Sequence, residues 1–143
     1  MKDLSDLLAA YRSTDFIIQA PNGELIMRCE HDNDAIDELV RRSGKRNCAF
    51  ITAHNPGSVK LRSFENARRH QELLHKVKAI GYPHFPGCGV GRCSNWDPEE
   101  SVFIIGIARS EAQELGRSFG QIAIVAKELG CRVELILCIE MST

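Results

Sequence analysis

The sequence lacks any long apolar run. No stretch approaches the roughly 20 consecutive apolar residues that a membrane-spanning helix needs. The opening residues, MKDLSDLLAAYRSTD, carry acids where a signal peptide carries bases. We therefore expect a cytoplasmic protein with no membrane partner. In that compartment the six cysteines are predicted to be reduced thiols rather than a disulfide framework.

The chain also has almost no net charge. Its 18 basic and 19 acidic residues give a formal charge of −1, which excludes a global field that would attract nucleic acid. Apolar residues make up 43% and charged residues 26%, which is typical of a soluble globular protein. Low-complexity segments, fixed-period repeats and linkers rich in proline, glycine or serine are absent. Residues 1–143 are therefore predicted to form one domain.

Apolar periodicity and turn residues predict the elements of this domain. Helices are expected after Asp3, from Asn33 to Gly44, from Ser63 to Gly81 and from Ser110, capped with Gln113, to Gly120. A hairpin is expected over 16–30, an edge strand or loop at 82–87, and strands at 48–53, 101–108, 121–126 and 132–139. This order predicts the α+β class, with helices packed on a mixed sheet. A ferredoxin-like core (βαββαβ) after an N-terminal helix and hairpin is the expected topology.

The stretch ITAHNPGS, residues 51–58, ends a buried strand in short hydrogen-bonding side chains. Asn55 precedes a proline and is therefore expected to be extended, with its amide at the end of the strand. Sheet-based sites are often built at such strand ends. The alternative is that Asn-Pro-Gly-Ser is simply turn chemistry.

The helix predicted from Ser63 carries a second set of polar candidates. Asn66 and His70 lie on its apolar stripe, and Arg69 reaches the same rim. A helix packed on the sheet would bring them near Asn55, and its N-terminus would favour an anionic or carbonyl-bearing ligand. The alternative is that Asn66 completes the helix cap and the arginines are solvated.

The glycine-rich stretch PGCGVGR is neither a dinucleotide fingerprint nor a P-loop, because a strand follows it rather than a helix. A flap or a backbone nest for an anion remains open. Cys88 and Cys93, with His84 nearby, have a spacing found among zinc ligands, but the sequence offers no second pair of ligands to complete a zinc site. We predict neither a metal nor a cofactor. A lone thiolate nucleophile is an equally weak alternative.

The loop NWDPEES contains the strongest catalytic candidate. Trp96, the only tryptophan, either packs on the core edge or offers a flat face to a ligand. Glu99 and Glu100 precede a buried strand, and Glu100 is the preferred general acid or base, with His70 second. The alternative is a solvated strand start. Gln121 opens a later strand with an amide that contacts either a ligand or the backbone.

Several of these stretches resemble DUF3293, a bacterial family catalogued as a domain of unknown function. The resemblance rests on FITAHNPGS, ENARRHQELL, GYPHFPGCGVG, WDPEESVFIIGI and LGRSFGQIAIV, and covers a core of about 48–126. It implies a small single-domain protein and no activity. The polar positions that match the family pattern are Thr52, Asn55, Asn66, Arg69, Trp96, Glu99, Glu100 and Gln121. Cys88 and Cys93 lie outside that pattern.

These observations predict a pocket at one end of the sheet. Ligand contacts are assigned to Asn55, Asn66, Arg69, Trp96 and Gln121, and catalysis to Glu100 and His70. The ligand is expected to be small, polar and nucleotide- or sugar-like, with hydrolytic or group-transfer chemistry if it reacts. The rival hypothesis is a non-catalytic interaction module that pairs with a partner protein or forms a homodimer.

Overall fold

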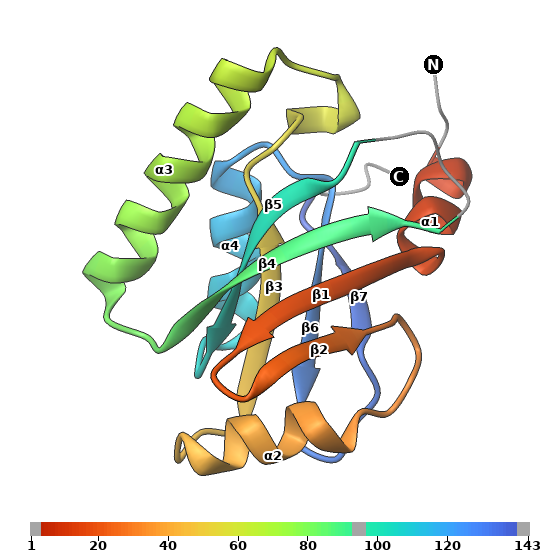
Figure 1. The fold of residues 1–143 in the computed structure, drawn as a ribbon. Helices are drawn as coiled ribbons and strands as arrows, with labels where there is room; N and C mark the ends of the chain where they lie inside the picture. Colours follow the sequence, from red (N-terminus) through yellow and green to blue (C-terminus); the bar gives the residue numbers. More distant parts are fainter. Residues whose placement is uncertain (1–3, 93–96, 140–143) are drawn as a thin grey trace.

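A computed structural model describes residues 4–92 and 97–139 (Figure 1). Along the chain its helices are α1 (Leu4–Arg12), α2 (Asp34–Arg42), α3 (Ser63–Ile80) and α4 (Arg109–Ser118), with a 3-10 turn, η1, at Pro56–Ser58. Its strands are β1 (Thr14–Ala20), β2 (Gly23–Met27), β3 (Asn47–Thr52), β4 (His84–Gly91), β5 (Glu99–Ile105), β6 (Ala123–Glu128) and β7 (Glu134–Leu137). None of the helices described is long and apolar enough to cross a membrane.

The strands form one sheet in the order β2-β1-β4-β5-β3-β6-β7. Every neighbouring pair is antiparallel, so the predicted α+β class is confirmed and the sheet is antiparallel rather than mixed. β3 and β5 occupy the centre, where Phe50 pairs with Phe103 and Thr52 with Ser101. The stretch 82–87, expected as an edge strand or loop, belongs largely to β4, which is an interior strand.

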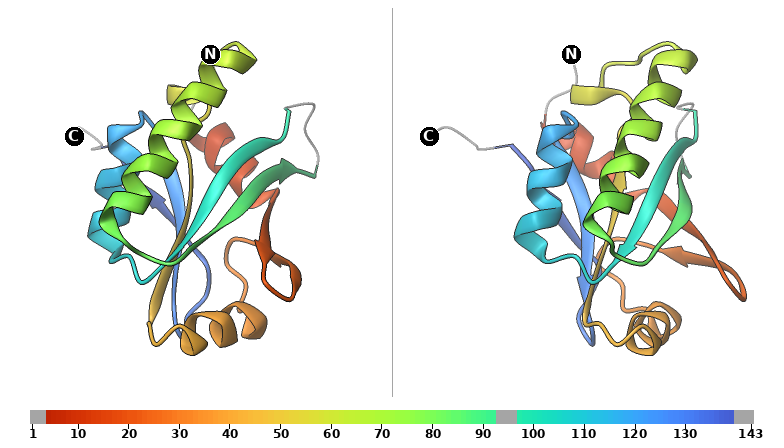
Figure 2. Two further views of the ribbon diagram at one scale, coloured as in Figure 1. Left: turned by 60° about the vertical axis from the view of Figure 1, so that its left-hand side comes forward. Right: turned by 90° about the vertical axis from the view of Figure 1, so that its left-hand side faces the viewer.

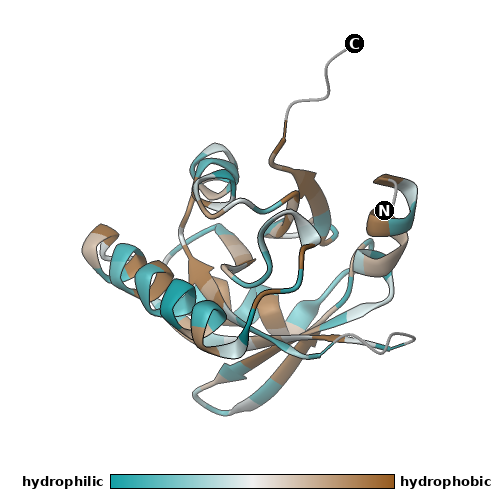
Figure 3. Ribbon diagram, turned by 90° about the horizontal axis from the view of Figure 1, so that it is seen from above, coloured by the Kyte–Doolittle hydropathy of each residue, from teal (hydrophilic) through white to brown (hydrophobic). Residues whose placement is uncertain are grey.

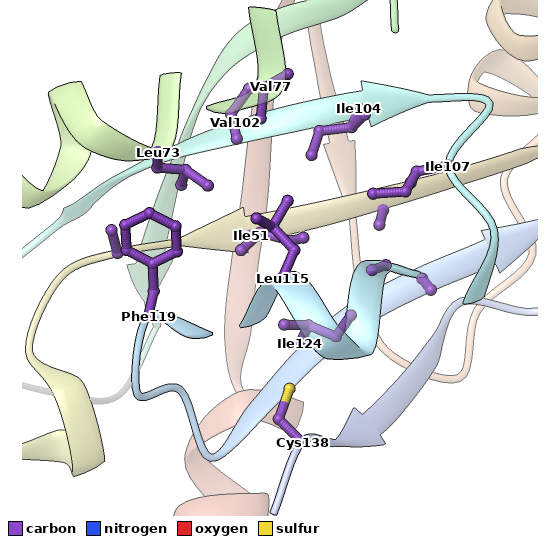
Figure 4. Close-up of a cluster of buried hydrophobic side chains, with 14 of the residues drawn as sticks. Ile51, Leu73, Val77, Val102, Ile104, Ile107, Leu115, Phe119, Ile124 and Cys138 are labelled. Atoms are coloured by element: carbon purple, nitrogen blue, oxygen red, sulfur yellow. The ribbon is translucent and has the colours of Figure 1, made fainter. Parts of the chain in front are cut away.

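Alternate residues of the central strands enter two separate cores. Ala49 and Ile51 of β3 face α3 and α4, where Leu73 and Leu115 cover them (Figure 4). Phe50, between them in sequence, faces the opposite side together with residues of β1, β2 and α2. This alternation is the period of two expected of a strand covered on both faces. Seen from above, the strands carry much of the hydrophobic sequence, whereas α3 is mainly hydrophilic (Figure 3).

The sheet curls strongly around the core that contains Phe50 (Figure 2). Backbone hydrogen bonds join the loop after β2 to the segment before β7: the Glu30 N–H donates to the Val133 carbonyl at 2.8 Å, and the Val133 N–H donates to the His31 carbonyl at 3.0 Å. The concave face is therefore nearly enclosed by strands. α2 lies at one end of this enclosure and α1 at the other (Figures 1 and 2).

The predicted start of α2 and the predicted glycine ends of α2, α3 and α4 hold, whereas the predicted caps at the starts of α3 and α4 do not. The Asn33 side chain accepts from the Ile36 N–H at the start of α2, and Gly81 ends α3 with a φ of 89°. The N-cap residues of α3 and α4, Arg62 and Ala108, make no side-chain capping hydrogen bond. The predicted box of Ser110 and Gln113 is replaced by a tertiary contact, in which Gln113 donates to the carbonyl of Leu137 at 2.6 Å.

Candidate functional site

A pocket of about 400 Å³ lies on the concave face of the sheet, beneath α1. Its walls come from α1, from strands β1, β3, β4, β5 and β6, and from the loops that follow β3 and α4. Mouths of curled sheets and barrels are common places for small-molecule sites, and this volume lies within the usual range of ligand pockets. The pocket also lies at the strand end where the sequence predicted a site.

Glycines in β4 make room for this pocket. Gly87, Gly89 and Gly91 alternate along the strand, and Gly89 and Gly91 line the cavity. A Cβ on Gly87 would lie 2.6 Å from the Phe50 ring, so only glycine allows this packing. A Cβ on Gly89 would meet only the Thr14 methyl group, at 3.7 Å, which is an ordinary contact. The stretch PGCGVGR therefore belongs to a strand, not a flap, and along this stretch one face of the strand carries only glycines.

Aromatic rings form the floor of the pocket. Phe16 and Phe50 meet edge to face, with ring centroids 5.2 Å apart. Tyr11 comes from α1, and its hydroxyl donates to the carbonyl of Ala123 at 3.2 Å. Burial raises the pKa of Tyr11, and the nearby carboxylate of Glu99 raises it further, so the phenol stays neutral.

Glu99 is the carboxylate that β5 presents to the pocket. Its Oε2 accepts from the Asn55 amide at 2.6 Å, and its backbone carbonyl accepts from the Ser101 hydroxyl at 2.9 Å. Ser101, two residues along the strand, lines the same face. Glu100 lies between them and therefore points to the other side of the sheet. The sequence prediction favoured Glu100; the pocket contains Glu99.

Asn55 is held in place by a pair of buried amides. Its backbone N–H donates to Asn66 Oδ1 at 2.9 Å, and Asn66 Nδ2 donates to Asn55 Oδ1 at 2.9 Å. Asn55 Oδ1 also accepts from the Leu61 N–H. With φ at 49° and ψ at 62°, Asn55 is left-handed rather than extended, a conformation that asparagine tolerates better than most residues. Asn55 lines the pocket, whereas Asn66 lies behind it.

Arg69 also supports the site from behind. Its guanidinium donates to the Ala53 carbonyl at 2.7 Å and to the Phe119 carbonyl, and so joins the end of β3 to the end of α4. Gln121 does line the pocket, and its Nε2 donates to the His54 carbonyl at 3.0 Å. Both side chains therefore fix the two loops that form this wall, and Arg69 is not among the lining residues.

His70 and Glu100 lie together on the α3 side of the sheet. His70 is 6% exposed, and its Nε2 lies 3.7 Å from Glu100 Oε2. Its ring meets that of His54 edge to face at 6.2 Å. His70 Nδ1 and His54 Nε2 are both buried and accept or donate no hydrogen bond within the described part of the chain. Burial lowers the pKa of His54, against the opposing effect of Glu99 and Glu100. His54 lines the pocket and so connects it to this pair.

The remaining candidates lie elsewhere. Trp96 and Cys93 fall outside the described residues. Cys88 is half-buried on the face of β4 opposite the glycines, and burial raises the pKa of its thiol, which weakens it as a nucleophile. Within residues 4–92 and 97–139, no three histidine, cysteine or acidic side chains converge as a metal site would require.

The comparisons with known proteins identify the family. The family model of DUF3293, described as a protein of unknown function, matches residues 51–124, more than half of the chain. The chain therefore belongs to this family, and the sequence resemblance is confirmed. No curated protein and no solved structure matches the chain. The ferredoxin-like name for the core consequently stays a prediction.

Proposed function

We propose that the pocket beneath α1 binds one small polar molecule, of the size of a sugar or a nucleoside. The observation that carries this proposal is the convergence of polar side chains on a cavity of about 400 Å³ with an aromatic floor. Natural ligand sites combine an apolar surface with a few placed hydrogen-bonding groups. A scattered polar set would instead favour the interaction module.

The hydrogen-bonding groups come from three parts of the chain. Glu99 and Ser101 stand on β5, Thr52 stands beside them on β3, and Gln121 with His54 forms the loop wall. Carboxylate, hydroxyl and amide groups together suit a ligand rich in hydroxyl or amino groups. The Phe16 and Phe50 rings suit the flat or apolar face of a sugar or a base. Asn55 orients Glu99, while Asn66 and Arg69 hold the loop behind it.

The test fills the pocket without disturbing the opposite face. Gly89→Val places a branched side chain in the cavity at a position with an ordinary backbone conformation. Cys88→Val, on the neighbouring outward-facing position, is the matched control. A panel of sugars and nucleosides is screened by thermal shift and by NMR chemical-shift changes on the wild type and both variants. We expect the responding compound to lose its effect on Gly89→Val and to keep it on Cys88→Val. A response that survives in Gly89→Val, or no response from any compound, contradicts the proposal.

A second candidate function is acid–base chemistry in the same pocket. The observation that favours it is the contact of His54, a lining residue, with the buried His70 and its carboxylate partner Glu100. A neutral imidazole in the wall can accept a proton, and a second imidazole with a carboxylate behind it can stabilise the charge that forms. Hydrolysis or group transfer is the chemistry expected of such a set. Chromogenic glycosides and nucleosides test this chemistry. The turnover of such a substrate should be lower in His54→Gln and in His70→Gln than in the wild type. Turnover equal to that of the wild type in both variants rejects the proposal.

A further inference from the structure

We infer that the ligand of this pocket is amphipathic: an aromatic or other apolar group lies against helix α1, and a hydrogen-bonding part lies against β3 and β5. The inference rests on the proposed function, because it assigns a chemical class to the molecule that the pocket binds. Three features carry it. The apolar side of α1 faces the cavity, part of that side has no place in the protein cores, and the polar groups stand on a different wall.

Helix α1 presents apolar side chains to the cavity. Leu7, Ala10 and Tyr11 line it at the spacing of a single helix face, together with Ala9 and with Asp6 of the first turn. None of the nine residues of α1 is buried. A surface helix normally turns such a stripe onto a core, whereas α1 turns it onto an open pocket.

Leu7 is the clearest member of this stripe. Tyr11 also packs against the core that contains Phe50, whereas Leu7 belongs to neither of the two cores that the described residues form. Leu7 is only half-buried, and the surface that it faces is the cavity. The free energy gained by covering a leucine side chain with an apolar group is therefore still available to a ligand.

Helix α1 is tied to the rest of the protein at its C-terminal end. The Tyr11 hydroxyl donates to the Ala123 carbonyl at 3.2 Å, and Arg92 Nη2 donates to the Arg12 carbonyl at 2.9 Å. A helix of nine residues is only marginally stable by itself, so it depends on the surface that its apolar stripe covers. A ligand with an apolar group beneath α1 should therefore stabilise this helix when it binds.

The polar groups of the pocket stand on a different wall. Thr52 and Ser101 are paired neighbours on β3 and β5, and Gln121 lines the cavity from the loop after α4. A ligand that is polar throughout, such as a free sugar, would place hydroxyl groups against Leu7. A ligand with separate apolar and hydrogen-bonding parts satisfies both walls. An aryl glycoside or a nucleoside has this division.

Two matched pairs of probes measure the contribution of the apolar group. The first pair is methyl β-D-glucoside and phenyl β-D-glucoside, and the second is methyl β-D-ribofuranoside and adenosine. Within each pair the sugar is the same and only the group on its anomeric carbon changes. Affinities are measured by NMR titration with the full chain. In at least one pair we expect the aromatic member to bind about tenfold or more tightly than the methyl member, and to slow amide hydrogen exchange within α1.

Leu7→Gln identifies the responsible side chain, because glutamine has a similar length and helix propensity but a polar end. This variant should lose most of the advantage of the aromatic member. Leu8→Gln makes the same change at the neighbouring position, which does not line the cavity, and should keep that advantage. Equal affinities within both pairs for the wild type overturn the inference. An advantage that persists in Leu7→Gln, or that is lost equally in the two variants, also overturns it.

The failure of this inference differs from the failure of the proposed function. If probes bind the wild type and lose their binding in Gly89→Val, but the aromatic and methyl members bind alike, only this inference fails. If no probe binds, or if binding survives in Gly89→Val, the proposed function fails and this inference fails with it.

Discussion

The buried amide pair behind the pocket gives the sharpest test of how the site is held. Asn66→Ala removes the acceptor of the Asn55 N–H and the donor to Asn55 Oδ1, both at 2.9 Å. Asn55 Oδ1 keeps its bond from Leu61, but the Asn55 N–H is left buried without a partner. Two lost hydrogen bonds and one unsatisfied buried donor together predict a loss of about 2–4 kcal/mol in the free energy of unfolding.

Equilibrium unfolding in urea measures this loss as a lower midpoint at an unchanged slope. Asn66→Asp is the informative second variant, because its carboxylate still accepts from the Asn55 N–H, but its second oxygen then faces the acceptor Asn55 Oδ1 and carries a buried charge. At neutral pH it should therefore lose at least as much stability as alanine. Arg68→Ala, on the exposed face of α3, is the control and should stay within about 0.5 kcal/mol of the wild type. If Asn66→Ala also stays within that margin, the amide pair does not hold the loop and the reasoning is refuted.

Three further changes test other parts of the structure. Gly116→Ala puts a Cβ 2.6 Å from Ile124 Cγ2, so overpacking should outweigh the gain in helix propensity and lower stability by about 1–2 kcal/mol; an unfolding free energy equal to the wild type contradicts this. Burial lowers the pKa of His54, so protons bind better to the unfolded chain, and stability should fall as the pH drops through about 6.5 toward the lower pKa of the folded state. His54→Gln should flatten that part of the pH profile measured by urea unfolding, and an unchanged profile rejects the assignment. Asp37→Ala leaves the buried Lys127 ammonium without its carboxylate and should cost about 3–5 kcal/mol, of which the double change Asp37→Leu with Lys127→Met recovers a large part in the same assay.

The features that depend on local chemistry were predictable from the sequence. Helix α3 ends at Gly81 because the chain needs a left-handed residue there and a proline follows two residues later. Gly116 inside a helix indicated close packing, and a Cβ at this position would indeed lie 2.6 Å from Ile124 Cγ2 and 2.8 Å from Cys138 Sγ. Asn55 was placed correctly at a strand end, next to Asn66.

The features that depend on register and long-range contact were not predictable in this way. Whether Glu99 or Glu100 enters a site depends on which face of β5 curls inward, and nothing within NWDPEES decides it. The register pairs Thr52 with Ser101, and Glu99, two residues before Ser101, shares its face of the strand. The choice between Glu99 and Glu100 therefore becomes clear only when this register is known. Likewise, α1 shows the stripe of a surface helix, and the sequence does not reveal that it lies over the concave face. The alternating glycines of β4 were the one local signal of the cavity, and their meaning depends on the strand on which they stand.

The polar residues of this region therefore divide into two groups with different consequences. Asn66 and Arg69 bond to other protein groups, so changing them should reduce stability and, through the loop, ligand affinity as well. Glu99 faces the cavity, so an isosteric change there should alter selectivity with little effect on folding. A site whose walls are fixed by one group and whose ligand-facing side chains come from the other can change its ligand without losing its fold. Measuring stability and selectivity on the same variants separates the two groups, and a variant of Asn66 that changes selectivity at unchanged stability would overturn the division.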